Sequence, residues 1–283
     1  MNDHAGTDTT PRGRPICLLL FLTAVAVGGL TGIALVSQPA PASQHGTHVD
    51  RLLQWLTVTL ATVLIAGHVV LIWSIWRSRR MQQSDHPPAS YRQELLWALI
   101  PVTVLTAAYV CEVASLGGPV WDQIYGSPNR AVSGDQPLQV EVVGKQFEWL
   151  IRLPGVDQRF GKTRVESIHE IRNPLGLDRE DPCARDDLII RGVLRLPRGR
   201  PVEVRMRSLD VQHALSLPDF RVRRDMIPGR STHTSFVPTR VGEFEMVCSE
   251  LCGPGHYKMQ GRILVMPKTV FADWISKQRG WFE

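Results

Sequence analysis

Three long apolar stretches, all within the first 117 residues, restrict the fold of this 283-residue chain more than any other feature. They cover about residues 16–36, 52–76 and 95–116. Roughly twenty apolar residues are enough to cross a bilayer as a helix. The second stretch ends in Trp73 and Trp76, which suit the membrane interface, and the third contains Pro101, which membrane helices tolerate. The pattern predicts a transmembrane helix hairpin over residues 43–117.

The first stretch has two interpretations. Arg12 and Arg14 precede it, and it is followed by Pro39-Ala40-Pro41-Ala42. A basic leader, an apolar run and an Ala-x-Ala ending are typical of a signal peptide, here cleaved after Ala42. The alternative is an additional, uncleaved membrane helix within residues 1–42. Both interpretations place residue 43 outside the cytoplasm.

The charged residues predict on which side of the membrane each segment lies, and they argue against a nucleic-acid partner. The linker 77–92 holds four arginines against a single acid, Asp85, so we expect it to be cytoplasmic. Residues 118–283 then form an extracytoplasmic domain of a multi-pass protein in a bacterial-type inner membrane. The net charge is +5, but residues 121–283 interleave 25 basic with 21 acidic residues. With no aromatic RNA platform or basic helix, we expect no nucleic-acid binding.

Beyond residue 117 the chain changes to short β-type runs between Gly and Pro turns, which indicate a mainly β, antiparallel sandwich. Residues 155–187, here called the excursion, are rich in Pro, Gly and charge and read as a long connection between strands. Only 270–278 reads as an amphipathic helix. The expected strands are 138–143, 147–153, 188–196, 202–207, 232–237 and 262–266.

The segment from Cys248 to Met259 carries the chemistry. Cys248, Cys252, His256 and Met259 place four soft or borderline ligands within twelve residues. Thiolate, imidazole and thioether together suit copper, and two thiolates can bridge two metal ions. A second imidazole is then needed, and His213 is the best candidate, ahead of a rival at 233. A disulfide between the two cysteines and a Cys2His2 zinc site are the alternatives.

The motif Cys-Ser-Glu-Leu-Cys-Gly-x-x-His-x-x-Met closely resembles that of the cytochrome c oxidase subunit II family. The stretches 210–213 and 225–230 are also similar to that family, as is Glu94-Leu-Leu-Trp97 before Pro101. The resemblance covers about residues 50–280. It implies a cupredoxin-like, antiparallel Greek-key β-sandwich behind the helix hairpin.

The resemblance also implies specific roles. His213, Cys248, Cys252, His256 and Met259 would bind two copper ions, a dinuclear copper A centre, through their side chains. Glu250 would bind copper through its carbonyl, and its carboxylate would reach a magnesium ion shared with subunit I. Glu94 would serve proton uptake.

Two aromatic positions bear on electron transfer. The family segment Gly-x-Gln-Trp-x-Trp is here Gly-Lys-Gln-Phe-Glu-Trp, with Phe147 at the usual electron-accepting position and Trp149 retained. The substitution puts the usual relay in doubt, and Trp149 reads equally well as a core aromatic.

The expected function follows from this resemblance. Subunit II of a haem-copper terminal oxidase would take electrons from cytochrome c or a similar soluble donor. It would pass them to haem in subunit I, where oxygen reduction drives proton translocation. An electron-accepting subunit of a nitric-oxide-reducing haem-copper enzyme is the closest alternative, and a membrane-anchored copper chaperone is a further one. The basic excess of the domain favours a neutral or acidic donor.

Overall fold

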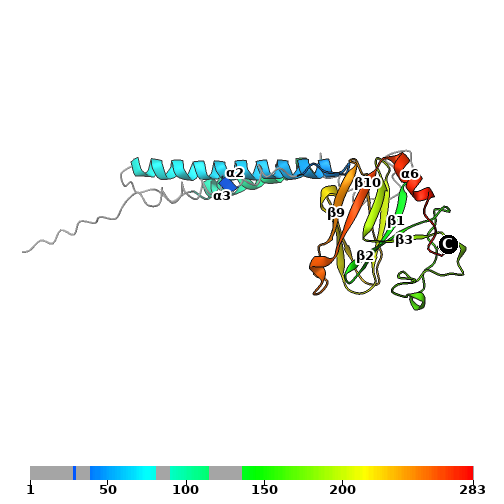
Figure 1. Ribbon diagram of the computed structural model, residues 1–283. Coiled ribbons are helices and arrows are strands. Elements are labelled where there is room, and N and C mark those ends of the chain that lie inside the picture. Colours follow the sequence, from blue (N-terminus) through cyan, green and yellow to red (C-terminus); the bar gives the residue numbers. More distant parts are fainter. Residues whose placement is uncertain (1–27, 30–38, 81–89, 115–135, 283) are drawn as a thin grey trace, which may run out of the picture. The chain divides into compact units, whose positions relative to one another are not determined.

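The computed structural model describes residues 28–29, 39–80, 90–114 and 136–282 (Figure 1). These residues form two compact units. One contains Arg51–Glu112, and the other, here called the β domain, combines Pro39–Asp50 with Val113–Glu283. Most of the predicted signal peptide or additional helix over 1–42 lies outside the described residues.

The membrane hairpin is built from two long helices, α2 (Gly46–Arg80) and α3 (Tyr91–Glu112). Within them Gly46–Arg77 and Tyr91–Cys111 are long and apolar enough to cross a membrane. Pro101 lies inside α3, and Glu94 lies in its first turn. Both predicted helices are therefore present.

The β domain is a sandwich of two five-stranded sheets in the part of the chain that the structure describes. Their orders are β3-β2-β1-β5-β8 and β4-β10-β9-β6-β7. The strands are β1 (Leu138–Lys145), β2 (Glu148–Leu153), β3 (Leu188–Arg191), β4 (Val193–Pro197), β5 (Val202–Ser208), β6 (His213–Leu217), β7 (Val222–Met226), β8 (Thr232–Phe236), β9 (Gly242–Cys248) and β10 (Gln260–Met266). Helix α6 (Lys268–Ser276) follows the last strand.

Two strand pairs depart from the expected antiparallel pattern. β1 pairs with β5, and β4 pairs with β10, in parallel. Parallel neighbours need a long crossover connection, and both pairs are far apart in sequence. The predicted run 188–196 is likewise two strands, because Gly192 at φ +68° turns the chain from one sheet into the other.

Residues 39–50 belong to the β domain, although they include the start of α2. Ala42 and Ser43 are fully buried. The Ala42 N–H donates to the carbonyl of Asp219 (2.6 Å), and the Ala42 carbonyl accepts from the Thr239 N–H (2.8 Å). Cleavage after Ala42 would remove both hydrogen bonds. The cleavage stays a prediction, and these contacts weigh against it.

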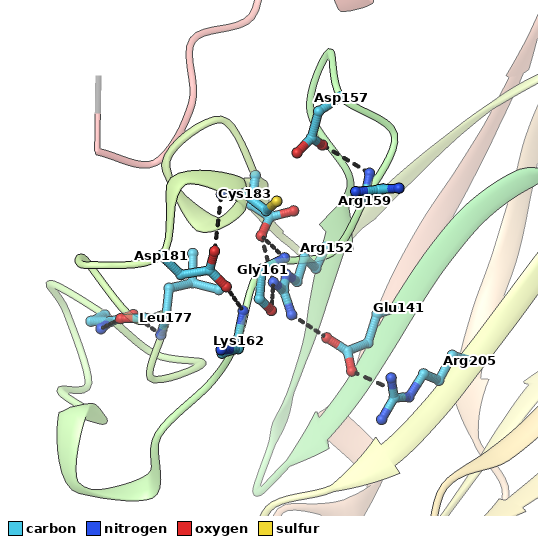
Figure 2. A network of polar contacts seen from close by, with 12 residues as sticks. Glu141, Arg152, Asp157, Arg159, Gly161, Lys162, Leu177, Asp181, Cys183 and Arg205 are labelled. Carbon is cyan, nitrogen blue, oxygen red and sulfur yellow. Dashed lines mark hydrogen bonds and ion pairs between the residues drawn. The ribbon is translucent and has the colours of Figure 1, made fainter.

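The excursion is attached to the sandwich by a buried ionic network (Figure 2). Arg152 on β2 pairs with Glu141 on β1 (3.2 Å) and with Asp187 at the end of the excursion. The same guanidinium donates to the carbonyl of Gly161 (2.5 Å). Burial raises the pKa of Asp187, and the hydrogen bond and charge of Arg152 oppose that rise. Buried charges are tolerated where they are paired in this way.

Within the excursion, side chains take the place of regular strand pairing. Asp181 accepts from the backbone N–H groups of Lys162 (2.7 Å) and Cys183 (3.2 Å), as Figure 2 shows. The C-terminal segment also holds the excursion, because the Trp281 indole N–H donates a hydrogen bond to the carbonyl of Arg172 (2.8 Å). The excursion is thus a folded part of the β domain.

Candidate metal centre

Neighbouring strands bring the sequence-distant ligands together. Cys248 ends β9, and His213 begins β6. These strands pair antiparallel, with Leu215 opposite Cys248. The loop from Ser249 to Met259, here called the ligand loop, then leads into β10 and carries the remaining candidates. In Figure 1 it is the orange-red connection between β9 and β10.

Each thiol of the pair has its own imidazole. His213 Nδ1 lies 3.9 Å from Cys248 Sγ, and His256 Nδ1 lies 3.6 Å from Cys252 Sγ. The two sulfur atoms are 3.9 Å apart, so the cysteines are not joined in a disulfide. The ligand atoms of His213, Cys248 and Cys252 all lie within 4.8 Å of one another.

Two weaker donors complete the arrangement, one beside each thiol. Met259 Sδ lies 3.8 Å from Cys252 Sγ, and the carbonyl oxygen of Glu250 lies 3.2 Å from Cys248 Sγ. Two ligands bound to one metal at roughly 2.0–2.3 Å are separated by about 3.3–3.8 Å in tetrahedral geometry. The observed spacings of 3.2–3.9 Å lie within about 0.1 Å of that range, so the atoms are close enough to share a metal, and the mixed thiolate, imidazole and thioether set fits copper.

The site is shielded from water on the thiol side. His213, Cys248, Cys252 and Met259 are buried, whereas His256 is half-buried. Burial, followed by the hydrogen bond with Cys248, raises the pKa of Cys252 to about 11. Without metal this sulfur is a neutral thiol at physiological pH. A bound cation must displace its proton.

A further shell of residues, which carried no predicted role, orients the ligands. Asp210 Oδ1 lies 2.8 Å from His213 Nε2, which leaves Nδ1 facing the thiol. The other oxygen of Asp210 accepts from the backbone N–H of Gln146 (2.7 Å), and the Gln146 side chain donates to the carbonyl of Cys252 (2.5 Å). A carboxylate partner on the distal nitrogen is the usual support of a metal-bound histidine. The position of Asp210, three residues before His213, was the available sequence signal.

The two candidate aromatics occupy different environments. Phe147 is half-buried against the ligand loop, so close that a Cβ on Gly255 would lie 2.4 Å from its ring. Trp149 is fully buried and lies edge-on to His213, with ring centroids 6.2 Å apart. Phe147 therefore packs on the outer side of the ligand loop, and Trp149 lies in the core beside His213.

The remaining candidates lie apart from the cluster or at its edge. Glu94 belongs to the helical unit, and His233 faces outward on β8, opposite Arg205. The Glu250 carboxylate points to Arg223, at 3.5 Å. The structure thus groups the six predicted copper ligands and leaves out the rival histidine.

Comparison with known proteins fits this geometry. Residues 138–266 match the family "Cytochrome C oxidase subunit II, periplasmic domain". The alternative cytochrome c oxidase subunit 2 of Bradyrhizobium diazoefficiens is 34% identical over 226 residues, covering 80% of this chain and 77% of that protein. The chain belongs to the cytochrome c oxidase subunit II family. It is subunit II of a haem-copper terminal oxidase, with two transmembrane helices among the described residues and a periplasmic β domain of the cupredoxin type.

Other members of the subunit II family are more distant. Cytochrome c oxidase subunit 2 of Cereibacter sphaeroides is 25% identical over 287 residues, covering 92% of this chain and 88% of that one. The crystal structure of the periplasmic domain of subunit II from Bradyrhizobium japonicum is 30% identical. It covers 50% of this chain and 93% of that chain, with a TM-score of 0.37. In a subunit II domain, the His/Cys/Cys/Met cluster indicates a copper site.

Proposed function

We propose that this subunit accepts electrons from cytochrome c or a similar soluble donor at a dinuclear copper centre and passes them to haem in subunit I. His213, Cys248, Cys252, His256 and Met259 would bind the metal pair through side chains, and Glu250 through its carbonyl oxygen. The observation that carries the proposal is the pairing of each thiol with its own imidazole, at 3.9 and 3.6 Å.

The residues explain why such a centre would transfer electrons efficiently. A copper pair held by these ligands would supply one-electron chemistry. The chain contributes rigidity: His213 and Cys248 lie on paired strands, Asp210 fixes the imidazole, and Gln146 holds the carbonyl of Cys252. Burial of the thiols keeps water from the sulfur atoms. Preformed ligands of this kind need no rearrangement between oxidation states.

Two further roles rest on the family resemblance alone. The Glu250 carboxylate would reach a magnesium ion shared with subunit I, and oxygen ligands suit that hard cation. Glu94, in the first turn of α3, would take up protons from the cytoplasmic side. Glu250→Gln tests the first role through the magnesium content of the oxidase. Glu94→Gln tests the second through the rate of proton pumping.

The decisive experiment counts metal. The periplasmic β domain, purified apart from the haem-containing subunit I, should hold two copper atoms, with a violet colour and a multi-line mixed-valence resonance. Cys252→Ser should abolish both signals. Cys183→Ser is the matched control, because that free cysteine lies in the excursion, and it should leave both unchanged. A single copper per unmodified subunit would overturn the proposal.

Met259→Leu tests the weakest ligand. Removing the thioether should keep both copper atoms and shift the reduction potential, because an axial sulfur tunes the potential. Loss of all copper would contradict an axial role for Met259.

A further inference from the structure

The excursion reaches the metal-centre end of the β domain. Its tip is a tight turn from His169 to Asn173, closed by two backbone hydrogen bonds (3.0 and 2.9 Å). Glu170 in this turn pairs with Lys145 (3.1 Å), the last residue of β1. Lys145 is two residues before Phe147, so their Cα atoms are at most about 7 Å apart. The tip is therefore held next to the segment that packs on the ligand loop.

The body of the excursion supports this position by packing on the outer face of a sheet. Leu175 is buried with Val143 and Leu150, which lie opposite each other on β1 and β2. Successive side chains of a strand point to opposite faces, so this pair faces away from the core that contains Val142 and Trp149. The carbonyl of Glu170 also accepts from the Arg191 guanidinium on β3. The tip is thus fixed by packing and hydrogen bonds.

Apolar side chains are exposed on both the tip and the ligand loop. Ile171 at the tip is 76% exposed, and Leu251 and Tyr257 on the loop are 82% and 69% exposed. Apolar and aromatic side chains of this kind form the centre of protein–protein contacts.

The charges between these side chains balance. Lys145 pairs with Glu170, and Arg191 pairs with Glu148. On the other side of the ligand loop, Arg223 pairs with Asp225 (3.1 Å). Arg172 on the tip and Lys258 on the ligand loop add two exposed positive charges, and Glu250 and Asp210 beside the loop add two negative ones. Charges of both signs are therefore interleaved, so this face presents no strong field of one sign to a partner.

We infer that the excursion tip (169–173), together with Leu251 and Tyr257, forms the docking surface for the soluble electron donor. The partner is a redox protein that presents an apolar patch around the exposed edge of its cofactor. Binding depends on burying apolar area, and net charge contributes little. This inference rests on the proposed function, because the surface surrounds the proposed electron-accepting site.

The test uses Ile171→Glu in the complete oxidase, with a reduced basic cytochrome c as the probe. A carboxylate at this position would lose its hydration on docking, so the second-order rate constant should fall by about fivefold or more. The loss should appear in KM, with kcat retained. Oxidation of tetramethyl-p-phenylenediamine, a small reductant that needs no protein docking, and the copper content should be unchanged.

Val156→Glu is the matched control. Val156 is 95% exposed and also lies in the excursion, but it follows Leu153, at the opposite end of β2 from Phe147. The second-order rate constant of the Val156→Glu enzyme with the cytochrome should equal that of the unmodified enzyme. Equal rates for the two variants, or a loss shared with the small reductant, would overturn the inference. Failure of the proposed function would instead appear as a missing copper pair in the unmodified enzyme.

Ionic strength provides a second measurement. Between about 50 and 200 mM salt the rate constant of the unmodified enzyme should change by less than about threefold, since balanced charges leave little to screen. A steep fall would contradict docking through apolar contact.

Discussion

The ligand loop and the excursion both connect strands with little regular structure, but different forces hold them. The ligand loop converges on sulfur and nitrogen atoms that lie 3.6–3.9 Å apart and are not covalently joined. The excursion is held by a buried guanidinium between two carboxylates and by carboxylates that accept backbone N–H groups. The ligand loop is expected to make its strongest bonds to a metal ion. The excursion makes its strongest bonds to other residues of the chain.

The metal centre and the packing of the excursion therefore depend on different residues of the β domain. Changes in the ionic network should loosen the excursion and leave the metal count intact. Changes in the ligand loop should alter the metal centre and leave the excursion folded. The following predictions test that independence, beginning with the largest effect.

Arg152→Met should have the largest effect on stability. It leaves Glu141 and Asp187 buried, with Asp187 deprived of its only guanidinium partner among the described residues. Removing one member of a buried ion pair costs about 3–5 kcal/mol. The free energy of unfolding of the β domain, from urea denaturation of the purified chain, should fall by that amount. The copper content of the folded protein should stay the same.

Arg164→Met is the matched control for Arg152. Arg164 pairs with Asp178 at 2.8 Å in the same excursion, but the Arg164 side chain is 55% exposed, whereas that of Asp178 is 8% exposed. Because one partner of this pair faces water, Arg164→Met should cost about 1 kcal/mol, less than the loss of the fully buried Arg152. Equal losses for the two variants would show that the buried network does not anchor the excursion.

Gly255→Ala should disturb the ligand loop by a smaller amount. The backbone at Gly255, with φ −94° and ψ 8°, accommodates alanine, and the nearest obstacle is the Phe147 ring, 2.4 Å from the new Cβ. Overpacking of this kind costs about 1–3 kcal/mol. The copper resonance should change, while proteolysis of the excursion should proceed at the unmodified rate.

The double variant Gly255→Ala with Phe147→Ala isolates this contact. Removing the ring removes the clash, so the copper resonance should return toward that of Phe147→Ala alone. Additive effects of the two substitutions would mean that Phe147 does not press on the loop.

The sequence predicted the cluster of candidate ligands more completely than it predicted the strands of the fold. The ligand types lie within twelve residues, and only His213 had to be found elsewhere. Gln146 and Asp210 carried no predicted role. Asp210 could have been found from its position three residues before His213, but a side chain that binds a backbone carbonyl, as that of Gln146 does, follows no spacing rule. Their function depends on how the β1–β2 turn meets the ligand loop, which only the folded chain shows.

Three strands escaped prediction for physical reasons. β7 carries Arg223, Arg224 and Asp225, because one of its faces contacts solvent. β6 is short and begins at the ligand His213. β9 had a clear signal that was missed: Phe244, Met246 and Cys248 alternate with exposed or half-buried neighbours. Alternation identifies a half-buried strand even where the sequence is charged.

The smallest expected effect concerns protons at the ligand loop. Burial raises the pKa of Cys252 to about 11, so between about pH 6 and 8 the metal-free thiol remains protonated. Copper binding must release that proton, so the apparent affinity should rise about tenfold per pH unit for each proton displaced. Competition titration of Cu(I) against a chelator at three pH values measures the slope. Because the excursion holds no ligand, the Arg164→Met protein should give the same slope, and a different one would couple the two regions.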